Sequence, residues 1–260
     1  MATNRHATNT LMQTQTELER IRQVYAGYRE RGLQHGKWSE ANPGNRAIVR
    51  ERQTMAASML AEGGRISLEN QEVLEVGCGS GKVLRSLVEM GAAAARCHGV
   101  DLLPDRIDAA RLVLPESEFR VANAEELPYA DNLFDLVLVF TVFSSILNDQ
   151  VAQSVAREIA RVLRVGGGVL WYDFRFNNPT NRNVRGMGRR SIIRLFPNFE
   201  FRLQSLTLLP PLARRLGPLT SVLYPALARL PFLRTHWLGL LKQRSSALCP
   251  LTVGRDSVES

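Results

Sequence analysis

The chain has 260 residues, a length that fits one large α/β domain with short appendages. Its composition, 45% hydrophobic and 22% charged, is that of a globular protein and excludes a disordered or fibrous chain. Three cysteines are too few for a disulfide framework or a zinc cluster, and no apolar stretch reaches the roughly 18 residues of a membrane span. The start lacks the apolar segment of a signal peptide, so we expect a cytoplasmic protein.

The net charge of +8 is unevenly distributed along the chain. Residues 174–244 contain thirteen basic residues and a single acid, Glu200, whereas the remainder is acidic by comparison. A basic excess of this kind is typical of proteins that bind nucleic acids or other anionic partners.

The first predicted structure is helical. Apolar side chains recur three to four residues apart over 17–61, and Pro43 and Gly44 break this pattern into two pieces. An aromatic and polar loop is predicted at 38–45, with the composition of a lid or a substrate edge. We therefore expect residues 1–64 to form an N-terminal helical cap or lid.

Strand-like and helix-like segments alternate through the middle of the chain. The predicted strands cover residues 72–76, 96–101, 118–122, 133–140 and 169–172. The predicted helices cover residues 81–90, 105–112 and 150–163, and the last of them should stop at the glycines 166–168. This alternation predicts a parallel sheet with crossover helices.

The last part of the chain extends this sheet. A polar loop at 173–188 is followed by a short helix to Phe196, a strand at 199–208, proline-broken amphipathic helices at 209–233 and a final strand at 235–241. We expect an α/β domain over 65–260, a doubly wound and mostly parallel seven-stranded sheet with a helical insertion before its last strand. The insertion packs on the core, forms the roof of an acceptor pocket or touches an anionic membrane surface.

A glycine-rich turn follows the first predicted strand, in the sequence Val-Leu-Glu-Val-Gly-Cys-Gly-Ser-Gly over 73–81. Such a turn lets the backbone approach a ligand, and the helix after it offers free N–H groups, so a nucleotide-like cofactor should bind there. A dinucleotide-binding dehydrogenase would need a further glycine where this chain has Lys82. The acid Glu75 inside the strand favours a cationic ligand instead of a phosphate.

With this turn the chain resembles the S-adenosylmethionine-dependent methyltransferases, in particular the broad methyltransferase-domain family that includes quinone-biosynthesis enzymes. The resemblance runs over 73–171 and implies a Rossmann-like fold, S-adenosylmethionine as cofactor and a donor-binding half at 72–172. It implies that Glu75 orients the methionine end of the donor and that Asp101 takes both ribose hydroxyls. The implied cofactor-binding residues are Glu75, Gly77, Cys78, Gly79, Gly81, Asp101, Leu102, Asn123, Ala124, Phe140 and Thr141.

Individual positions have their own implied roles. Leu102 would cover one face of the adenine, and the end of the fourth strand, Phe140 and Thr141, would face the methionine moiety. The family usually has Asp where this chain has Asn123, whose amide oxygen can still accept a hydrogen bond from the adenine amine.

The acceptor-side half, 173–244, begins with an unusual run of polar residues. Methyl transfer from a sulfonium needs alignment and exclusion of water but no metal, so no metal site is predicted. A hydroxyl acceptor would need a base, for which Asp173 is the candidate. Predicted substrate-binding residues for a polyhydroxylated or anionic acceptor are Arg175, Asn177, Asn178, Asn181 and Arg185.

Several functions remain open at this point. The loop is similar to that of bacterial methyltransferases found among surface-glycan biosynthesis proteins, which implies O-methylation of a sugar or polyol, small or lipid-linked. A quinone or natural-product acceptor is the alternative, and a donor-binding protein without catalysis is another. An RNA methyltransferase is less favoured, because no Asn/Asp-Pro-Pro-aromatic run follows the fourth strand. His236 is expected to be a packed residue, and the oligomeric state is open.

Overall fold

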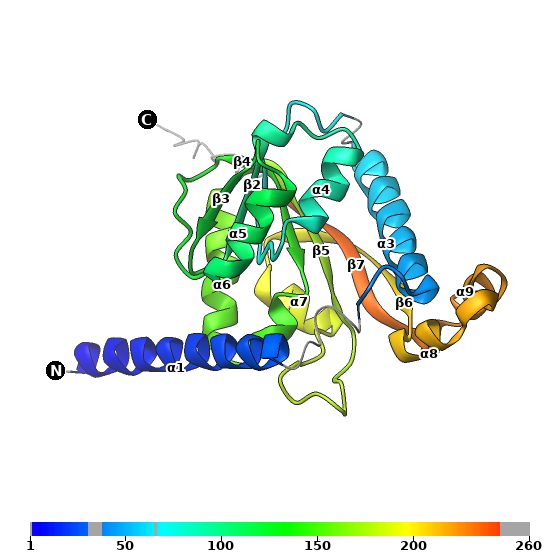
Figure 1. Cartoon of the computed structure of the whole chain (residues 1–260). Coiled ribbons are helices and arrows are strands. Elements are labelled where there is room, and N and C mark those ends of the chain that lie inside the picture. The colour runs from blue at the N-terminus through cyan, green and yellow to red at the C-terminus, as the bar shows by residue number, and fades with distance from the viewer. Residues whose placement is uncertain (1, 31–37, 65–66, 245–260) are drawn as a thin grey trace, which may run out of the picture.

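The computed structural model describes residues 2–30, 38–64 and 67–244, with side chains from residue 15 onward. Its centre is a seven-stranded sheet in the order β3-β2-β1-β4-β5-β7-β6, in which β7 runs antiparallel to both neighbours (Figure 1). The remaining pairs are parallel, which confirms the predicted doubly wound fold. The strands are Val73–Val76 (β1), Cys97–Asp101 (β2), Glu118–Val121 (β3), Phe134–Phe140 (β4), Leu163–Phe174 (β5), Phe199–Leu208 (β6) and Arg234–Gln243 (β7).

Helices cover both faces of the sheet (Figure 1). Along β4, Leu136 and Leu138 point into a core shared with α3, α4 and α5, whereas Val137 and Val139 point into a core shared with α6 and α7. This alternation is the two-residue period of a strand that is buried on both faces. The helices are Ala2–Glu30 (α1), Pro43–Glu62 (α3), Lys82–Glu89 (α4), Pro104–Val113 (α5), Asp149–Val162 (α6) and Arg189–Leu195 (α7), with short 3₁₀ turns at Ala94–Arg96 (η1) and Phe143–Ser145 (η2).

The predicted boundary between the sixth helix and the fifth strand was wrong. No glycine stops α6, because Leu163 is already extended and starts β5 six residues earlier than expected. The glycines 166–168 lie inside the strand, where the pairing with β4 shifts from Phe134 opposite Leu163 to Leu136 opposite Gly168. The extra residues bulge out of the ladder, and Gly166 takes a φ of +78° there.

The N-terminal helices also differ from their predicted limits. α1 begins at Ala2, well before residue 17. Pro43 and Gly44 start α3 instead of breaking a helix, because Asn42 caps it by accepting hydrogen bonds from the N–H groups of Gly44 and Asn45. Of the loop predicted at 38–45, only 38–42 precedes the helix. The division at residue 64 into a cap and a methyltransferase domain stays a prediction.

Residues 209–233 connect β6 to β7 through the predicted short helices. These are Pro210–Arg215 (α8), Gly217–Leu219 (η3), Thr220–Leu227 (α9) and Pro231–Leu233 (η4). Their inner side packs on α3, where Ile48 contacts a core of Leu208, Ala213 and Tyr224. Across the described residues, no helix combines the length and the apolar character needed to cross a membrane.

Candidate functional site

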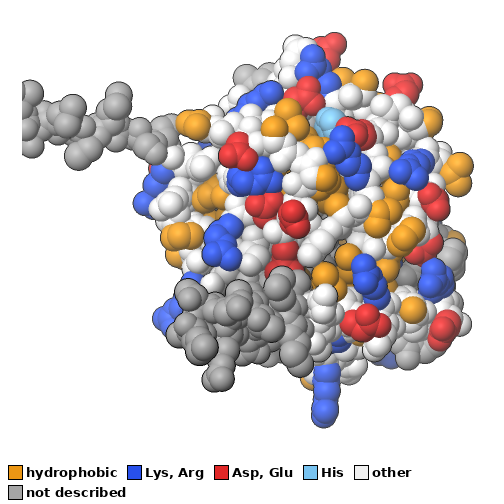
Figure 2. Space-filling model, turned by 90° about the vertical axis from the view of Figure 1, so that its left-hand side faces the viewer, with side chains coloured by type: hydrophobic (Ala, Val, Ile, Leu, Met, Phe, Trp, Pro, Cys, Tyr) orange, Lys and Arg blue, Asp and Glu red, His pale blue; other side chains and the backbone are white. Residues whose placement is uncertain are grey.

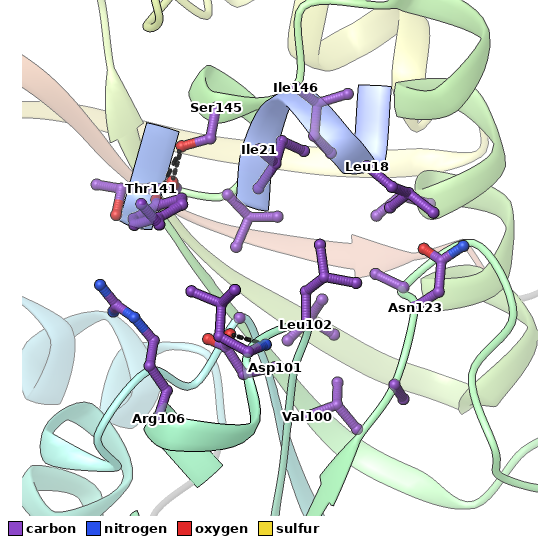
Figure 3. Close-up of a pocket in the computed structure, with 18 of the residues that line it drawn as sticks. Leu18, Ile21, Val100, Asp101, Leu102, Arg106, Asn123, Thr141, Ser145 and Ile146 are labelled. Atoms are coloured by element: carbon purple, nitrogen blue, oxygen red, sulfur yellow. Dashed lines mark hydrogen bonds between the residues drawn. The ribbon is translucent and has the colours of Figure 1, made fainter. Parts of the chain in front are cut away.

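A cavity of about 160 Å³ lies at the carboxyl ends of β1 to β4, where α1 covers it (Figure 3). This is the edge at which ligands bind to open α/β sheets. The cavity brings together seven of the predicted cofactor residues from four segments of the chain: Gly77, Asp101, Leu102, Asn123, Ala124, Phe140 and Thr141.

Within the glycine-rich turn, only Gly77 reaches the cavity. Its φ is +70°, and a Cβ there would lie 2.7 Å from a methyl group of Val142. Gly79 and Gly81 shape the turn with φ values of +53° and +73° and do not line the cavity. The thiol of Cys78 is buried in the core below, and burial raises its pKa. These three residues therefore support the turn from outside the cavity.

Asp101 ends β2 on the floor of the cavity. Its two carboxylate oxygens accept hydrogen bonds from the N–H groups of Gly79 at 2.9 Å and Leu103 at 3.0 Å. Burial raises the pKa of this carboxyl group. Each oxygen keeps a further lone pair, so the group can still accept from two neighbouring hydroxyls.

The residues predicted to contact the adenine and the methionine lie at or just after the ends of β3 and β4. The amide oxygen of Asn123 accepts a hydrogen bond from the N–H of Glu125 at 3.1 Å. Thr141 follows β4 with a φ of +57°, which is uncommon for a residue other than glycine. Its N–H donates to the carbonyl of Tyr172 at 2.7 Å, and its hydroxyl donates to that of Phe140 at 2.7 Å. Backbone strain of this kind gathers at functional sites.

Glu75 lies beneath the cavity instead of lining it. It is almost fully buried, and one carboxylate oxygen accepts a hydrogen bond from the N–H of Leu84 at 3.3 Å. Burial raises its pKa well above the usual range. Because a single hydrogen bond offsets little of the cost of burying a carboxylate, a cation nearby would stabilise its charged form.

Sequence reasoning missed Arg52, which α3 holds next to this carboxylate. Its guanidinium carbon lies 5.4 Å from the centre of the Phe140 ring and 5.3 Å from that of Tyr172, and its charge acts on Glu75. Among the described residues it makes no hydrogen bond or ion pair. No motif marks it, since it precedes the glycine turn by more than twenty residues.

The second missed contribution comes from α1. Leu18, Ile21 and Tyr25 line the cavity from the side opposite Asp101, as Figure 3 shows for Leu18 and Ile21. The buried carboxylate of Glu17 attaches the helix by accepting from the N–H of Leu147 at 2.6 Å. Contacts between residues more than one hundred positions apart leave no local signal in the sequence.

Two further polar contacts hold α1 in this position. Arg20 forms an ion pair with Glu17 at 2.8 Å and also donates to the carbonyl of Ser145. Arg29 pairs with Asp105 at the start of α5 at 2.8 Å. These attachments hold α1 over one side of the cavity.

Asp173, the predicted base, is not placed on the cavity. It is completely buried, and its oxygens accept hydrogen bonds from the N–H groups of Ser144 at 2.9 Å and Phe174 at 2.8 Å. Burial raises its pKa to about 6. In this position the carboxylate holds the turn after β4, and the catalytic role predicted for it has no support from the geometry.

The five predicted substrate-binding residues do not line the cavity either. Arg175 stacks on Trp237, with 4.4 Å between its guanidinium carbon and the ring centre, and donates to the carbonyls of Pro231 and Arg234. Arg185 pairs with Asp149.

The three asparagines of this loop that were predicted to bind substrate form hydrogen bonds within the protein. Asn177 accepts from the N–H of Gly186, and Asn178 accepts from both polar groups of Thr180. Asn181 donates to the hydroxyl of Tyr28 on α1 at 2.9 Å, so it alone of the five connects the loop to the helix over the cavity. Much of the loop's polarity therefore serves its own conformation.

His236 is a packed residue, as expected. Its ring stacks on that of Tyr172 with 4.7 Å between centres, and burial lowers its pKa to about 3.

Comparisons with known proteins agree with this geometry. A family described as "Methyltransferase domain" matches residues 74–171. A methyltransferase of Mycobacterium tuberculosis, described as uncharacterized, is 37% identical over 39% of this chain and 40% of its own length. A demethylmenaquinone methyltransferase of Lactobacillus johnsonii is 30% identical over 48% of this chain and 52% of its own length.

A solved structure shares the fold. It is a geranyl diphosphate C-methyltransferase from Streptomyces coelicolor in complex with Mg²⁺, geranyl diphosphate and S-adenosyl-L-homocysteine, with a TM-score of 0.55, 15% identity and coverage of 74% of this chain and 77% of that one. The chain spans about two fifths to one half of the length of the two curated relatives above. Residues 74–171 of this chain therefore match a methyltransferase domain, and the Rossmann-like fold around them is shared with the Streptomyces coelicolor structure.

Proposed function

We propose that the protein transfers a methyl group from S-adenosylmethionine to a small-molecule acceptor. The observation that carries this proposal is the cavity, where the ends of four neighbouring strands present Gly77, Asp101, Asn123 and Thr141 to one space. When bound, the donor would supply an electrophilic methyl group on a sulfonium. The protein's own task is to hold donor and acceptor in line and to exclude water, to which the apolar side chains of α1 would contribute.

The adenosine part of the donor fits the covered side of the cavity. In this proposal Asp101 accepts hydrogen bonds from both ribose hydroxyls, and Asn123 accepts one from the adenine amine. Leu102 and the α1 residues Leu18 and Ile21 provide apolar surface for the adenine ring. Figure 3 shows these side chains pointing into the same space from above and below.

The methionine part would lie toward Thr141, near the buried carboxyl group of Glu75 and the partly buried guanidinium of Arg52. The carboxylate of Glu75 gains a cation when the donor's ammonium group approaches it. The guanidinium of Arg52 can bind the donor's carboxylate, because an arginine in a partly buried position favours an anionic partner.

Calorimetry with S-adenosylmethionine and S-adenosylhomocysteine tests the donor site. We expect both to bind, NAD not to bind, and Asp101→Ala to weaken binding at least tenfold, since it removes the acceptor of two hydroxyls. Asp108→Ala is the matched control, because this acid lies on α5 with an exposed side chain paired to Arg111. Binding of NAD without either sulfur ligand would overturn the proposal.

A second pair of variants tests the carboxylate contact. Arg52→Gln should weaken donor binding about tenfold or more, whereas Arg50→Gln, an exposed neighbour on the same helix, should leave it unchanged. Equal affinities for the two variants would remove Arg52 from the donor site and leave the rest of the proposal intact.

For the acceptor we propose a hydroxyl of a sugar or polyol, free or lipid-linked, in the cytoplasm. Its support is the group of hydroxyls next to the donor cavity, where Tyr25 lies 3.3 Å from the hydroxyl of Ser145 and Thr141 is adjacent. The two described cysteines, Cys78 and Cys97, are unpaired, as a reducing compartment requires.

A quinone acceptor is the second candidate, favoured by the Lactobacillus johnsonii relative and by the bonding of the polar loop within the protein. Transfer of a labelled methyl group from S-adenosylmethionine to a panel of glycans and demethylated quinones separates the two classes. Donor binding without transfer to any class would favour a binding protein without catalysis.

A further inference from the structure

The outer side of residues 209–233 carries an unusual concentration of exposed apolar side chains. Six of the twelve exposed large hydrophobic residues in the described part of the chain lie in this stretch, which we name the apolar corner: Leu209, Leu219, Val222, Leu223, Leu230 and Phe232. Val222 is 70% exposed and Phe232 is 74% exposed. Single apolar residues are common on a surface, but six of them within one short stretch of chain call for an explanation.

The orientation of α9 is fixed by contacts on its other side. Thr220, Tyr224 and Ala228, spaced four residues apart, are buried against the rest of the protein. The hydroxyl of Tyr224 donates to a carboxylate oxygen of Glu51 on α3 at 2.8 Å. Val222 and Leu223 lie on the other side of the helix, so their exposure follows from this packing.

The charged residues within 209–233 are all of one sign. Residues 209–233 contain no Asp, Glu, Asn, Gln or Lys, and their charged residues are Arg214, Arg215 and Arg229. The longer stretch 201–244 contains no acid at all. By contrast, the face in Figure 2 mixes basic and acidic side chains around scattered apolar ones, as an ordinary water-facing surface does.

We propose that the apolar corner binds the surface of an anionic lipid membrane. The apolar side chains would enter the boundary between head groups and acyl chains, and Arg215 and Arg229, both exposed, would meet the lipid phosphates. A second copy of this chain fits less well, because a symmetric contact through this surface would bring arginines against arginines. The contact is peripheral, and it uses no residue that lines the donor cavity.

Co-sedimentation with vesicles tests this proposal in the full chain. The probes are vesicles of phosphatidylglycerol and phosphatidylcholine in equal parts, and vesicles of phosphatidylcholine alone. We expect binding to the anionic vesicles that decreases with salt, and at least about tenfold weaker binding of the double variant Val222→Asp/Phe232→Asp. The matched control is Leu112→Asp/Val165→Asp, which charges two residues that are 87% and 74% exposed outside the apolar corner.

Three results would overturn the proposal. The first is absence of binding to the anionic vesicles, and the second is equal loss of binding in the control variant. The third is a concentration-dependent dimer in sedimentation velocity that Val222→Asp/Phe232→Asp abolishes, which would make a second copy the occupant. Thermal unfolding of both double variants shows whether they keep the fold. Calorimetry with S-adenosylmethionine on the same samples tests the methyltransferase proposal separately.

Discussion

Replacement of Asp173 by asparagine tests whether this buried carboxylate is a base or a structural group. Burial raises its pKa from an ordinary value of 3.8 to about 6. At about 1.4 kcal/mol per pKa unit, ionising this group in the folded protein costs about 3 kcal/mol. Between these two pH values the folded state binds more protons than the unfolded state. The contribution to the free energy of unfolding is therefore present below pH 4 and is lost as the pH rises through 6.

The asparagine variant removes this pH dependence but loses a hydrogen bond. Asp173 accepts from the N–H groups of Ser144 and Phe174, and an amide side chain can satisfy only one of them with its oxygen. The loss costs about 1–3 kcal/mol. We therefore expect Asp173→Asn to be less stable than wild type at pH 4 and about equally stable at pH 8.

Urea unfolding of both proteins at several pH values measures this difference directly. The free-energy difference between them should change by about 3 kcal/mol from pH 4 to pH 8, whereas Asp108→Asn, whose carboxylate is 72% exposed, should show no such change. A difference independent of pH would refute the effect assigned to burial. Loss of turnover by more than about a hundredfold with intact donor binding would make Asp173 the base after all.

Three further variants probe the core, the turn and the helix over the cavity. Phe143→Ala should lower the free energy of unfolding by about 3–5 kcal/mol in urea titrations, because this buried ring stacks on Trp171 at 4.8 Å. Gly77→Ala should abolish calorimetric donor binding through its positive φ and the contact with Val142, whereas retained affinity would show that the turn can relax. Glu17→Ala should weaken donor binding and speed proteolysis of α1, and unchanged digestion would show that its hydrogen bonds do not hold the helix.

The predictable part of the site is local in sequence. Gly77, Asp101 and Thr141 each end a strand, and parallel strands place their carboxyl ends at one edge, so the motif order was enough to bring them together. Cys78 and Glu75 have the same local signal but are buried outside the cavity: Glu75 lies on the face of β1 opposite to Val76, and the turn directs Cys78 into the core. A motif therefore identifies the segment without telling which of its side chains reach the ligand.

The part of the site that could not be predicted depends on contacts between residues that lie far apart in the sequence. Arg175 and Asn177 belong to a run whose polarity predicted acceptor binding, yet their partners are backbone groups of the protein itself. Composition cannot tell a polar group that is free for a ligand from one that a neighbour already satisfies. The same limit applies to Tyr25 and Arg52, whose roles depend on where two helices dock.

The single antiparallel strand has a consequence for how two substrates could meet. Because β7 runs against β5 and β6, the connection 209–233 starts and ends at the edge of the sheet where β1, β2 and β4 also end. The apolar corner and the donor cavity thus lie along the same edge of the sheet. If the apolar corner binds a membrane, an acceptor dissolved in the bilayer would reach the donor cavity along this edge of the sheet. The water-soluble donor would enter the cavity from the aqueous side.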